Sequence, residues 1–515
     1  MDNAKYLGDF ARLTPDKPAV INGSTAEQIT YRELDQRSNR LAHYLLDAGL
    51  RHGDRIAVFL ENHIRCFEVC WAALRSGLQI VTINRFLTTD EAAYIVNDSG
   101  AKALVTSWAL RNVASELPPL IPDCPNRLMI DGNIDGWSRF EDAVATFSSE
   151  PLSEQWLGGL MLYSSGTTGR PKGIYRTMPK TNATAGLPLS PVLRMCGFNA
   201  DSVFLSTAPL YHSAPIGNSL SMQCIGATLV FMEKFDALQS LELIERYRVT
   251  HSQWVPTMFV RLLKLSEAER RRHDLSSLRL ANHSAAPCPL DVKRQMIDWW
   301  GPILVEYYGA TETGAVTALD SQQWLQHPGS VGHPIPGVTL HICDDDGIEQ
   351  PIGSAGLIYI ERDQPGYVYH NDPKKTRESR HPQHDNWCCA GDIGYLDEDG
   401  YLYLTDRKSF MIISGGVNIY PQAIENALVM HASVDDAAVI GVPNAEMGEE
   451  VKAIIQPMPG LVASDDLSRE LLAFLDGKIA RYMMPRSIEF MEQLPRLPTG
   501  KLYKQQLRER YWPKA

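Results

Sequence analysis

Short apolar runs alternate with amphipathic helical segments through about residue 400 of the chain. Thr30 and Glu33 form a capping-box signature, apolar residues then recur on one helical face, and Gly49 predicts the end of that helix. Because strands separated by helices build mostly parallel, buried sheets, the pattern predicts an α/β fold: a large N-terminal domain of mixed and parallel sheets flanked by helices. The predicted strands are 56–60, 79–83, 102–106, 127–130, 159–163, 203–206, 227–231, 249–255 and 278–282.

The pattern changes after residue 408, where turn signals and short Tyr/Leu strands give way to a compact set of elements. A helix opened by Pro421 is followed by strands at 436–442 and 451–457, a helix with apolar residues from Leu467 to Ile479, and a strand at 487–491. A segment of this size is long enough for a small α+β core of its own. We therefore predict an N-terminal domain over residues 1–406 and a C-terminal domain over residues 407–515.

Composition and charge narrow the class of protein. The chain has 515 residues, 44% of them hydrophobic, and a formal net charge of −12, which gives it no global electrostatic reason to bind nucleic acid. The N-terminus shows no signal-peptide pattern, and no apolar run approaches the length of an integral membrane segment. Nine cysteines without CxxC spacing favour reduced thiols, so we expect a cytoplasmic protein. Oligomeric state is not readable, and a homodimer stays open.

The stretch from Tyr163 to Gly173, YSSGTTGRPKG, follows an apolar run and is rich in hydroxyl side chains and glycine. Backbone N–H groups in such a loop can point at one anion, and glycine permits close approach. The spacing fits neither the Walker A nor the Rossmann pattern. On composition alone, a phosphate cradle and a flexible surface loop both remain open.

This stretch and five further motifs resemble, in order, those of the acyl-adenylate-forming superfamily, which includes acyl-CoA synthetases and the adenylation domains of peptide synthetases. The other motifs are APLYH at 208–212, YYGATET at 307–313, AGD at 390–392, TDRKSFMIISGGVNIYPQAIE at 405–425 and LPTGK at 497–501. The resemblance spans nearly the whole chain. It implies ATP, Mg²⁺ and coenzyme A as cofactors, and a small C-terminal domain that moves between two half-reactions.

The resemblance also implies roles for individual residues in nucleotide binding. Glu312 is expected to bind Mg²⁺, with Thr168 as a second metal-site residue, although a plain loop glutamate is the alternative reading. Asp392 is expected to accept hydrogen bonds from the ribose hydroxyls, because its two oxygens suit a cis-diol. The expected ATP-binding residues are Ser164, Ser165, Gly166, Thr167, Thr168, Gly169, Lys172, Ser284, Ala285, Tyr307, Tyr308, Gly309, Thr311, Asp392 and Arg407, with Tyr308 stacking on adenine.

Lys501 resembles the catalytic lysine that lies between the carboxylate and the α-phosphate and lowers their repulsion. Thr168, Glu312 and His212 complete the expected catalytic set, although a lone histidine is also a common core residue. In the second half-reaction, Gly415 and Gly416 are expected to line the path of coenzyme A. The chain departs from the usual family pattern at Ser409 and Phe410, so control of the domain movement stays open.

The expected acid pocket is formed by residues 211–217, 253–258, 282–287 and 309–314, which are largely apolar or small. Its expected substrate-binding residues are Tyr211, His212, Trp254 and Gly309. These segments offer no buried aspartate for an amino-acid ammonium group, so we expect an apolar carboxylic acid. Linear fatty, aryl and polycyclic acids all remain open.

The predicted function is that of an acyl-CoA synthetase: a carboxylic acid is activated as acyl-AMP with release of pyrophosphate, and its acyl group then passes to coenzyme A. One alternative keeps the first step but passes the acyl group to a carrier protein, or oxidises it as luciferases do. Another is a non-catalytic acyl- or nucleotide-binding homologue. The presence of Lys501, Glu312 and Asp392 argues against the last alternative.

Overall fold

The apolar runs of the N-terminal half form two large sheets in the computed structural model. It describes residues 5–164, 171–178, 180–187, 191–364, 366–407, 410–415, 417–496 and 502–512. The first sheet is six-stranded and parallel throughout. Its strand order is β7 (Ser138–Arg139), β6 (Asn126–Ile130), β5 (Ala103–Ser107), β3 (Arg55–Phe59), β4 (Gln79–Ile83) and β8 (Gly159–Leu160). The helices associated with it include α2 (Tyr31–Asp47), α3 (Arg65–Arg75), α4 (Thr89–Ser99), α5 (Arg111–Ala114) and α6 (Phe140–Val144).

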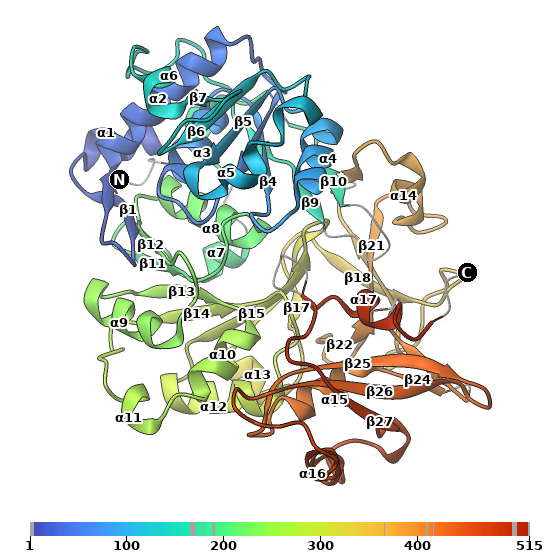
Figure 1. Cartoon of the computed structure of the whole chain (residues 1–515). Helices are drawn as coiled ribbons and strands as arrows, with labels where there is room; N and C mark the ends of the chain where they lie inside the picture. The colour runs from blue at the N-terminus through green and yellow to red at the C-terminus, as the bar shows by residue number, and fades with distance from the viewer. Residues whose placement is uncertain are drawn as a thin grey trace.

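The second sheet is nine-stranded and has a parallel centre with antiparallel strands at both ends. Its strand order is β17 (His333–Pro334), β16 (Gly314–Asp320), β15 (Leu304–Ala310), β14 (Leu280–His283), β13 (His251–Trp254), β11 (Val203–Ser206), β12 (Thr228–Phe231), β1 (Pro18–Asn22) and β2 (Gln28–Thr30). Helix α8 (Ser213–Cys224) lies between the two large sheets (Figure 1). The opposite face of the nine-stranded sheet packs on helices that include α9 (Ala237–Tyr247), α10 (Pro256–Leu263) and α12 (Leu290–Trp300).

Two smaller sheets complete the N-terminal part. A three-stranded sheet runs β20 (Val368–Tyr369), β10 (Lys172–Tyr175), β9 (Leu162–Ser164), and helix α14 (Pro373–Glu378) follows β20. A four-stranded antiparallel sheet runs β18 (Thr339–Cys343), β19 (Gly356–Glu361), β21 (Trp387–Leu396), β22 (Leu402–Arg407). These observations confirm the predicted α/β fold class.

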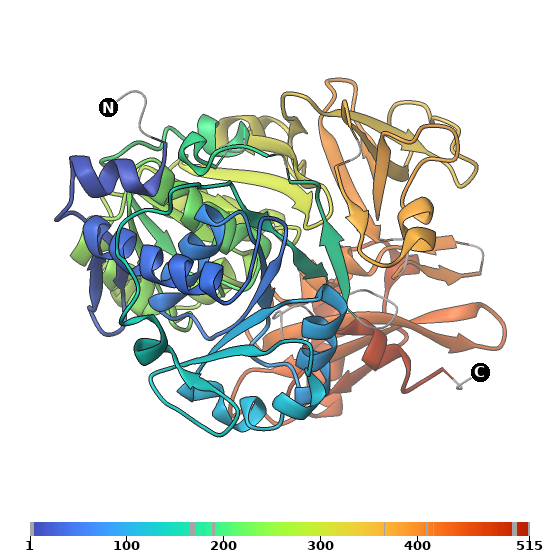
Figure 2. The same cartoon turned by 90° about the horizontal axis from the view of Figure 1, so that it is seen from above.

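A further sheet follows Arg407 and has a hydrophobic core of its own. It contains β23 (Ile412–Ser414), β24 (Val417–Ile419), β25 (Val434–Asn444), β26 (Gly448–Pro457) and β27 (Ser487–Phe490), with helices α15 (Pro421–Leu428), α16 (Asp465–Leu475) and α17 (Lys504–Arg508). This C-terminal unit lies against the nine-stranded sheet's side of the molecule (Figures 1 and 2). There Lys264 Nζ donates to the Val434 carbonyl at 2.8 Å, and Met430 packs on the core of the N-terminal part.

The local signals predicted most elements well. Thr30 Oγ1 accepts the Glu33 N–H and Glu33 returns the bond to the Thr30 N–H, so the predicted capping box begins α2. The predicted strand at 159–163 is wrong in one respect. Its first part pairs with β4 in the six-stranded sheet, and the second part pairs with β10 in the three-stranded sheet. The chain therefore changes sheet at Met161.

In the part of the chain that the structure describes, no helix is both long enough and apolar enough to cross a bilayer.

Candidate functional site

The YYGATET motif forms the tip of an antiparallel hairpin between β15 and β16. Gly309 and Gly314 let the two strands approach closely, since a Cβ on Gly309 would lie 2.1 Å from the Gly314 carbonyl oxygen. Thr311 and Glu312 are half-buried in the turn between the strands. The residues predicted to bind the α-phosphate and Mg²⁺ therefore project from a short, braced turn.

Arg176 fixes the backbone of this turn through hydrogen bonds. Its Nη2 donates to the carbonyl oxygens of Thr311 at 2.6 Å and Glu312 at 3.0 Å. The guanidinium is largely buried, and that burial lowers its pKa. Sequence reasoning missed Arg176, although its place directly after β10, which begins at Lys172, was the available signal.

Asp392 lies next to Tyr308. The Tyr308 hydroxyl donates to Asp392 Oδ2 at 2.6 Å, and Asp392 is buried in β21. The Gly391–Asp392 pair, which in sequence resembles a turn, lies within a strand instead. Asp392 follows Gly391, whose φ is +86°, where β21 bulges against β19 between Cys389 and Ile393. A bulge redirects side chains, which explains how a strand residue faces Tyr308 here.

Arg407, another expected ATP-binding residue, is the strand partner of Asp392 in β22. Two residues predicted from neighbouring motifs are thus brought into register.

Lys172 opens β10, and its strand partner is Ser164 at the end of β9. Its Nζ lies 2.9 Å from Asp372 Oδ2 and 5.8 Å from the centre of the Tyr369 ring. The Tyr369 hydroxyl in turn donates to Glu312 Oε1 at 3.2 Å. Tyr369, which sequence reasoning missed, therefore lies between the predicted phosphate-binding lysine and the predicted metal-binding carboxylate.

Ser284 and Ala285 continue from the carboxyl end of β14. Ser284 is buried, and its side chain lies near that of Tyr307, as does the side chain of Asn218 on α8. Burial raises the pKa of Tyr307. Ala285 has a φ of +77°, a left-handed conformation that is uncommon for a residue with a side chain and that concentrates at functional sites.

Tyr211 and His212 lie where α8 begins. Their rings are 4.5 Å apart, His212 is the N-cap residue of α8, and the Tyr211 carbonyl accepts from Thr82 Oγ1 at 2.7 Å. Burial raises the pKa of Tyr211 to about 12, so its hydroxyl stays protonated at neutral pH. Both side chains are half-buried.

Trp254 was expected to line the acid pocket, and the structure places it elsewhere. It is fully buried on the helix-covered face of β13, packed against Phe259 and Trp300, and its Nε1 donates to Ser252 Oγ at 2.7 Å. Successive residues of a strand face opposite sides, so Gln253 rather than Trp254 faces α8. Asn218 Nδ2 donates to Gln253 Oε1 at 2.9 Å, which confirms that orientation.

Some predicted residues cannot be placed with the others. Ser165, Gly166, Thr167, Thr168, Gly169, Gly416 and Lys501 lie outside the described residues. Gly415 is described, with a φ of +56°, and lies in the turn after β23 of the C-terminal sheet, apart from the sheets that carry the predicted nucleotide-binding residues.

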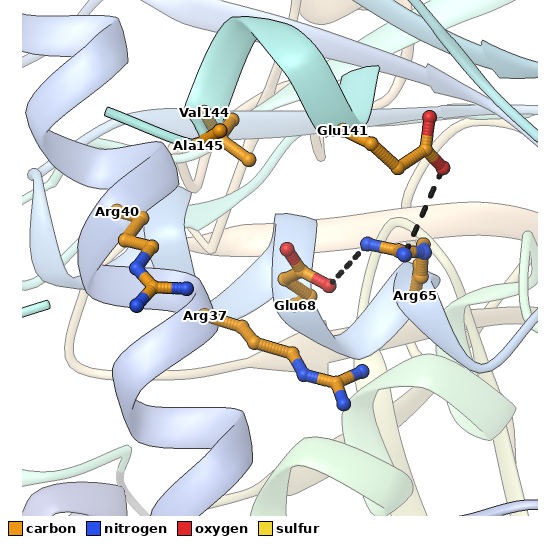
Figure 3. A pocket seen from close by; sticks show the side chains of 7 residues that line it. All are labelled: Arg37, Arg40, Arg65, Glu68, Glu141, Val144 and Ala145. Atoms are coloured by element: carbon orange, nitrogen blue, oxygen red, sulfur yellow. Dashed lines mark hydrogen bonds and ion pairs between the residues drawn. The ribbon is translucent and has the colours of Figure 1, made fainter. Parts of the chain in front are cut away.

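A pocket of about 250 Å³ lies away from these motifs, between α2, α3 and α6 (Figure 3). Arg65 crosses it to Glu68 at 3.3 Å and to Glu141 at 3.7 Å, while Arg37 pairs with Glu33 at 3.8 Å. Most of its positive charge is therefore already compensated within the protein. None of the residues that line it belongs to the motifs: Arg37, Arg40, Arg65, Glu68, Glu141, Val144 and Ala145.

Comparison with known families decides the class of this protein. Residues 7–370 match the family model described as AMP-binding enzyme, and residues 423–501 match the model for the AMP-binding enzyme C-terminal domain. The chain belongs to the AMP-binding enzyme family. It is thus an acyl-adenylate-forming enzyme and an AMP-forming acid–thiol ligase.

Individual relatives of this AMP-binding enzyme match over nearly their whole length. A feruloyl-CoA synthase from Amycolatopsis sp is 34% identical, covering 97% of this chain and 97% of the relative. The fatty acid–[acyl-carrier-protein] ligase ScoC from Streptomyces coeruleorubidus is 30% identical, covering 98% and 95%. The crystal structure of ATP-bound MatB from Rhodopseudomonas palustris superposes with a TM-score of 0.81 at 29% identity, covering 99% of both chains.

Proposed function

We propose that this AMP-binding enzyme is an ATP-dependent acyl-CoA synthetase that activates a carboxylic acid with an apolar body. The observation that carries the proposal is the convergence of Tyr308, Glu312, Lys172 and Asp392 around one hairpin tip, although they come from motifs far apart in sequence. The family match supplies the ATP-dependent adenylation chemistry that such a site performs.

In this proposal the hairpin tip and its neighbours bind ATP. Asp392 accepts the ribose hydroxyls, while Tyr308, already bonded to it, is held as a platform for adenine. Lys172 exchanges its ion pair with Asp372 for the β- and γ-phosphates, because the triphosphate offers a stronger negative partner. The Thr311 backbone, fixed by Arg176, positions the threonine hydroxyl toward the α-phosphate.

Glu312 fits a magnesium ion that is shared with the nucleotide. Its carboxylate is half-buried and accepts one bond from Tyr369. In the described ranges no three His, Cys, Asp or Glu side chains gather into a metal site of their own. Mg²⁺ typically takes one or two carboxylates plus phosphate oxygens and waters, so this donor set suits Mg²⁺ bound together with ATP. Such an ion would neutralise part of the phosphate charge.

The reaction has two steps, and the first must bring two negatively charged groups together. The carboxylate oxygen attacks the α-phosphorus and pyrophosphate leaves, with the Lys501 ammonium reducing repulsion between the two anions. The coenzyme A thiol then attacks the acyl carbon, and AMP leaves. The change of sheet between Arg407 and Ile412 supports a domain boundary at residues 406 and 407, about which the C-terminal unit would turn between the steps. Because ATP and coenzyme A are cytoplasmic substrates, we place the enzyme in the cytoplasm.

A second candidate acceptor is a carrier protein. The relative ScoC, named as an acyl-carrier-protein ligase, is the specific observation in its favour. The adenylation step is the same in both cases, and only the thiol differs.

The test measures pyrophosphate release and acylated product for a panel of carboxylic acids, with coenzyme A, with a phosphopantetheinylated carrier protein, or with neither thiol. We expect acyl-CoA to form in the arm with coenzyme A and steady-state pyrophosphate release to require it. Product formation only in the carrier-protein arm would show that the acceptor is a carrier protein and not coenzyme A. Absence of pyrophosphate release with every acid would contradict the proposed function as a whole.

Asp392→Asn should raise the KM for ATP by about 10- to 100-fold, because a hydrogen bond to a charged group contributes about 1.5–3 kcal/mol. The amide oxygen still accepts from Tyr308, so the hairpin tip keeps its shape. Steady-state kinetics with ATP and the acid varied separately measures the change. Asp399→Asn, in the exposed turn after β21, is the matched control and should leave both KM values unchanged. An equal rise in the KM for the acid would argue against a ribose role.

A further inference from the structure

A row of polar side chains crosses the nine-stranded sheet on the face that α8 covers. Ser206 of β11, Gln253 of β13 and Asn282 of β14 are direct register partners. The next partner is the apolar Val305 of β15, where the polar row ends. Register partners in neighbouring parallel strands point to the same side of the sheet. Gln253 shows which side this is, because its amide oxygen accepts from Asn218 on α8.

The side chain of Asn282 has no hydrogen-bond partner among the described residues. It is fully buried, and both Nδ2 and Oδ1 are unpaired. Exchanging the amide nitrogen and oxygen would change nothing, since neither position has a partner. Ser206 Oγ, in the same row, is also buried and unpaired within the described part of the chain. Unpaired buried polar groups are costly, so native proteins rarely keep them without a ligand or an ordered water.

The polar row lies further from the carboxyl ends of the strands than the predicted nucleotide-binding residues do. Asn282 precedes Ser284 by two residues on the same strand face, which places it roughly 7 Å deeper along β14. Tyr307 lies near both Ser284 and Asn218, and Asn218 bonds Gln253, so the same face links the predicted nucleotide-binding strand ends with the polar row. Val305, the register partner of Asn282 on β15, packs with Leu280 and Phe198 against an apolar cluster that contains Cys196.

We propose that Asn282 is a specificity-determining residue that binds a hydroxyl group on the distal part of the acid substrate. This inference rests on the proposed function, in which the acid's carboxylate meets ATP at the strand ends. An acid whose tail runs between α8 and the sheet reaches Asn282 after about 7 Å, the depth given above. A hydroxyl both donates and accepts, so it satisfies the amide oxygen and nitrogen together. The expected apolar acid therefore carries a distal hydroxyl, as a hydroxyaryl acid does.

The test compares hydroxylated and unsubstituted acids of equal length, 4-hydroxycinnamate with cinnamate and 4-hydroxybenzoate with benzoate. A site built to bond a hydroxyl discriminates strongly against the analogue that lacks it. We expect the wild-type enzyme to favour the hydroxylated member of at least one pair by about tenfold or more in kcat/KM. Asn282→Leu, which keeps the volume and removes both polar atoms, should abolish that preference through a loss confined to the hydroxylated acid.

Ser240→Ala is the matched control, since Ser240 is a buried serine on α9 whose hydroxyl bonds the Ala237 carbonyl. It should keep the wild-type ratio. Equal or better use of the unsubstituted acids by the wild-type enzyme would overturn the inference and would leave a buried water as the partner of Asn282. That comparison needs no variant, so it decides even if Asn282→Leu fails to fold. Pyrophosphate release with any acid in the panel would show that the proposed function survives such a result.

Discussion

Lys501→Ala is expected to slow acyl-adenylate formation by about 10²–10³-fold, the usual cost of removing one preorganised electrostatic contact to the transition state. Transfer of a supplied acyl-AMP to coenzyme A should be largely unaffected, because that step joins no two anions at phosphorus. The effect should appear mainly in kcat, since the contact strengthens as charge develops on the pentacoordinate phosphorus. Lys501 is the last residue of the segment that matches the C-terminal domain model of the family.

Two assays separate the steps: pyrophosphate release from ATP and acid in a single turnover, and acyl-CoA formation from chemically prepared acyl-AMP. Lys478→Ala makes the same change at an exposed lysine of the C-terminal unit and should leave both rates at the wild-type level. An equal loss in both assays for Lys501→Ala would refute the division of labour between the two steps. It would instead indicate a general role for this lysine in the fold or in nucleotide binding.

Local patterns predicted most of the fold because helices and buried strands have their own periodicity. The strand predicted at 79–83 agrees with β4 at both ends, and the helix predicted after Thr30 begins at its capping box. The sheet pairing of the strand at 159–163 could not be predicted in the same way. Its residues are continuously apolar, and nothing local indicates that Gly159 and Leu162 pair in different sheets. Sheet membership is a long-range property, so periodicity alone could not reveal it.

In the candidate site, too, the sequence predicted what depends on local motifs but not what depends on long-range packing. Motif order predicted Tyr308, Glu312 and Asp392, and the structure brings all three to one hairpin tip. The prediction for Trp254 is off by one residue. The neighbouring Gln253, and not Trp254, lies on the face of the sheet that α8 covers. A one-residue shift along a strand reverses the side it faces.

The polar row was also invisible in the sequence. Ser206 and Asn282 follow largely apolar strand segments and Gln253 follows a polar one, and each looks in isolation like an ordinary strand residue. Only the parallel register of β11, β13 and β14 aligns them on one face. The alignment of these polar side chains is therefore a tertiary property, which residue type along the chain does not reveal.

Removing one member of the buried Lys293–Glu306 pair should destabilise the protein by about 3–5 kcal/mol, because it leaves an uncompensated charge in the core. Lys293 Nζ lies 2.5 Å from Glu306 Oε2, and Lys293 also lies 4.9 Å from the centre of the Trp324 ring. Both residues are almost fully buried, Lys293 on α12 and Glu306 on β15. Glu306 immediately precedes Tyr307 and Tyr308, so this pair supports the strand that carries the nucleotide motif.

Lys293→Met keeps most of the side-chain volume and removes the charge, and its effect is measured as a fall in the denaturant midpoint of the N-terminal part. Arg271→Met breaks an exposed pair with Glu267 instead and should cost less than about 1 kcal/mol, which makes it the matched control. The double variant Lys293→Met with Glu306→Leu should recover most of the loss, since a well-packed apolar pair can replace a buried ion pair at little cost. A double variant as unstable as Lys293→Met would show that packing, and not the unpaired carboxylate, causes the loss.

The pH dependence provides an independent check on that cause. Burial already raises the pKa of Glu306, and Lys293 partly offsets the rise. Without Lys293 the folded-state pKa rises further above the unfolded value, so the neutral carboxyl is favoured in the folded protein. The stability of Lys293→Met should therefore approach that of the wild type as the pH falls toward the unfolded pKa, and should be lost as the pH rises through the folded pKa. His283, whose pKa is lowered by burial and by Lys293, lies 3.8 Å from Glu306 and would gain a proton more easily in the variant. Both changes act in the same direction, so a destabilisation that is independent of pH would contradict an electrostatic origin.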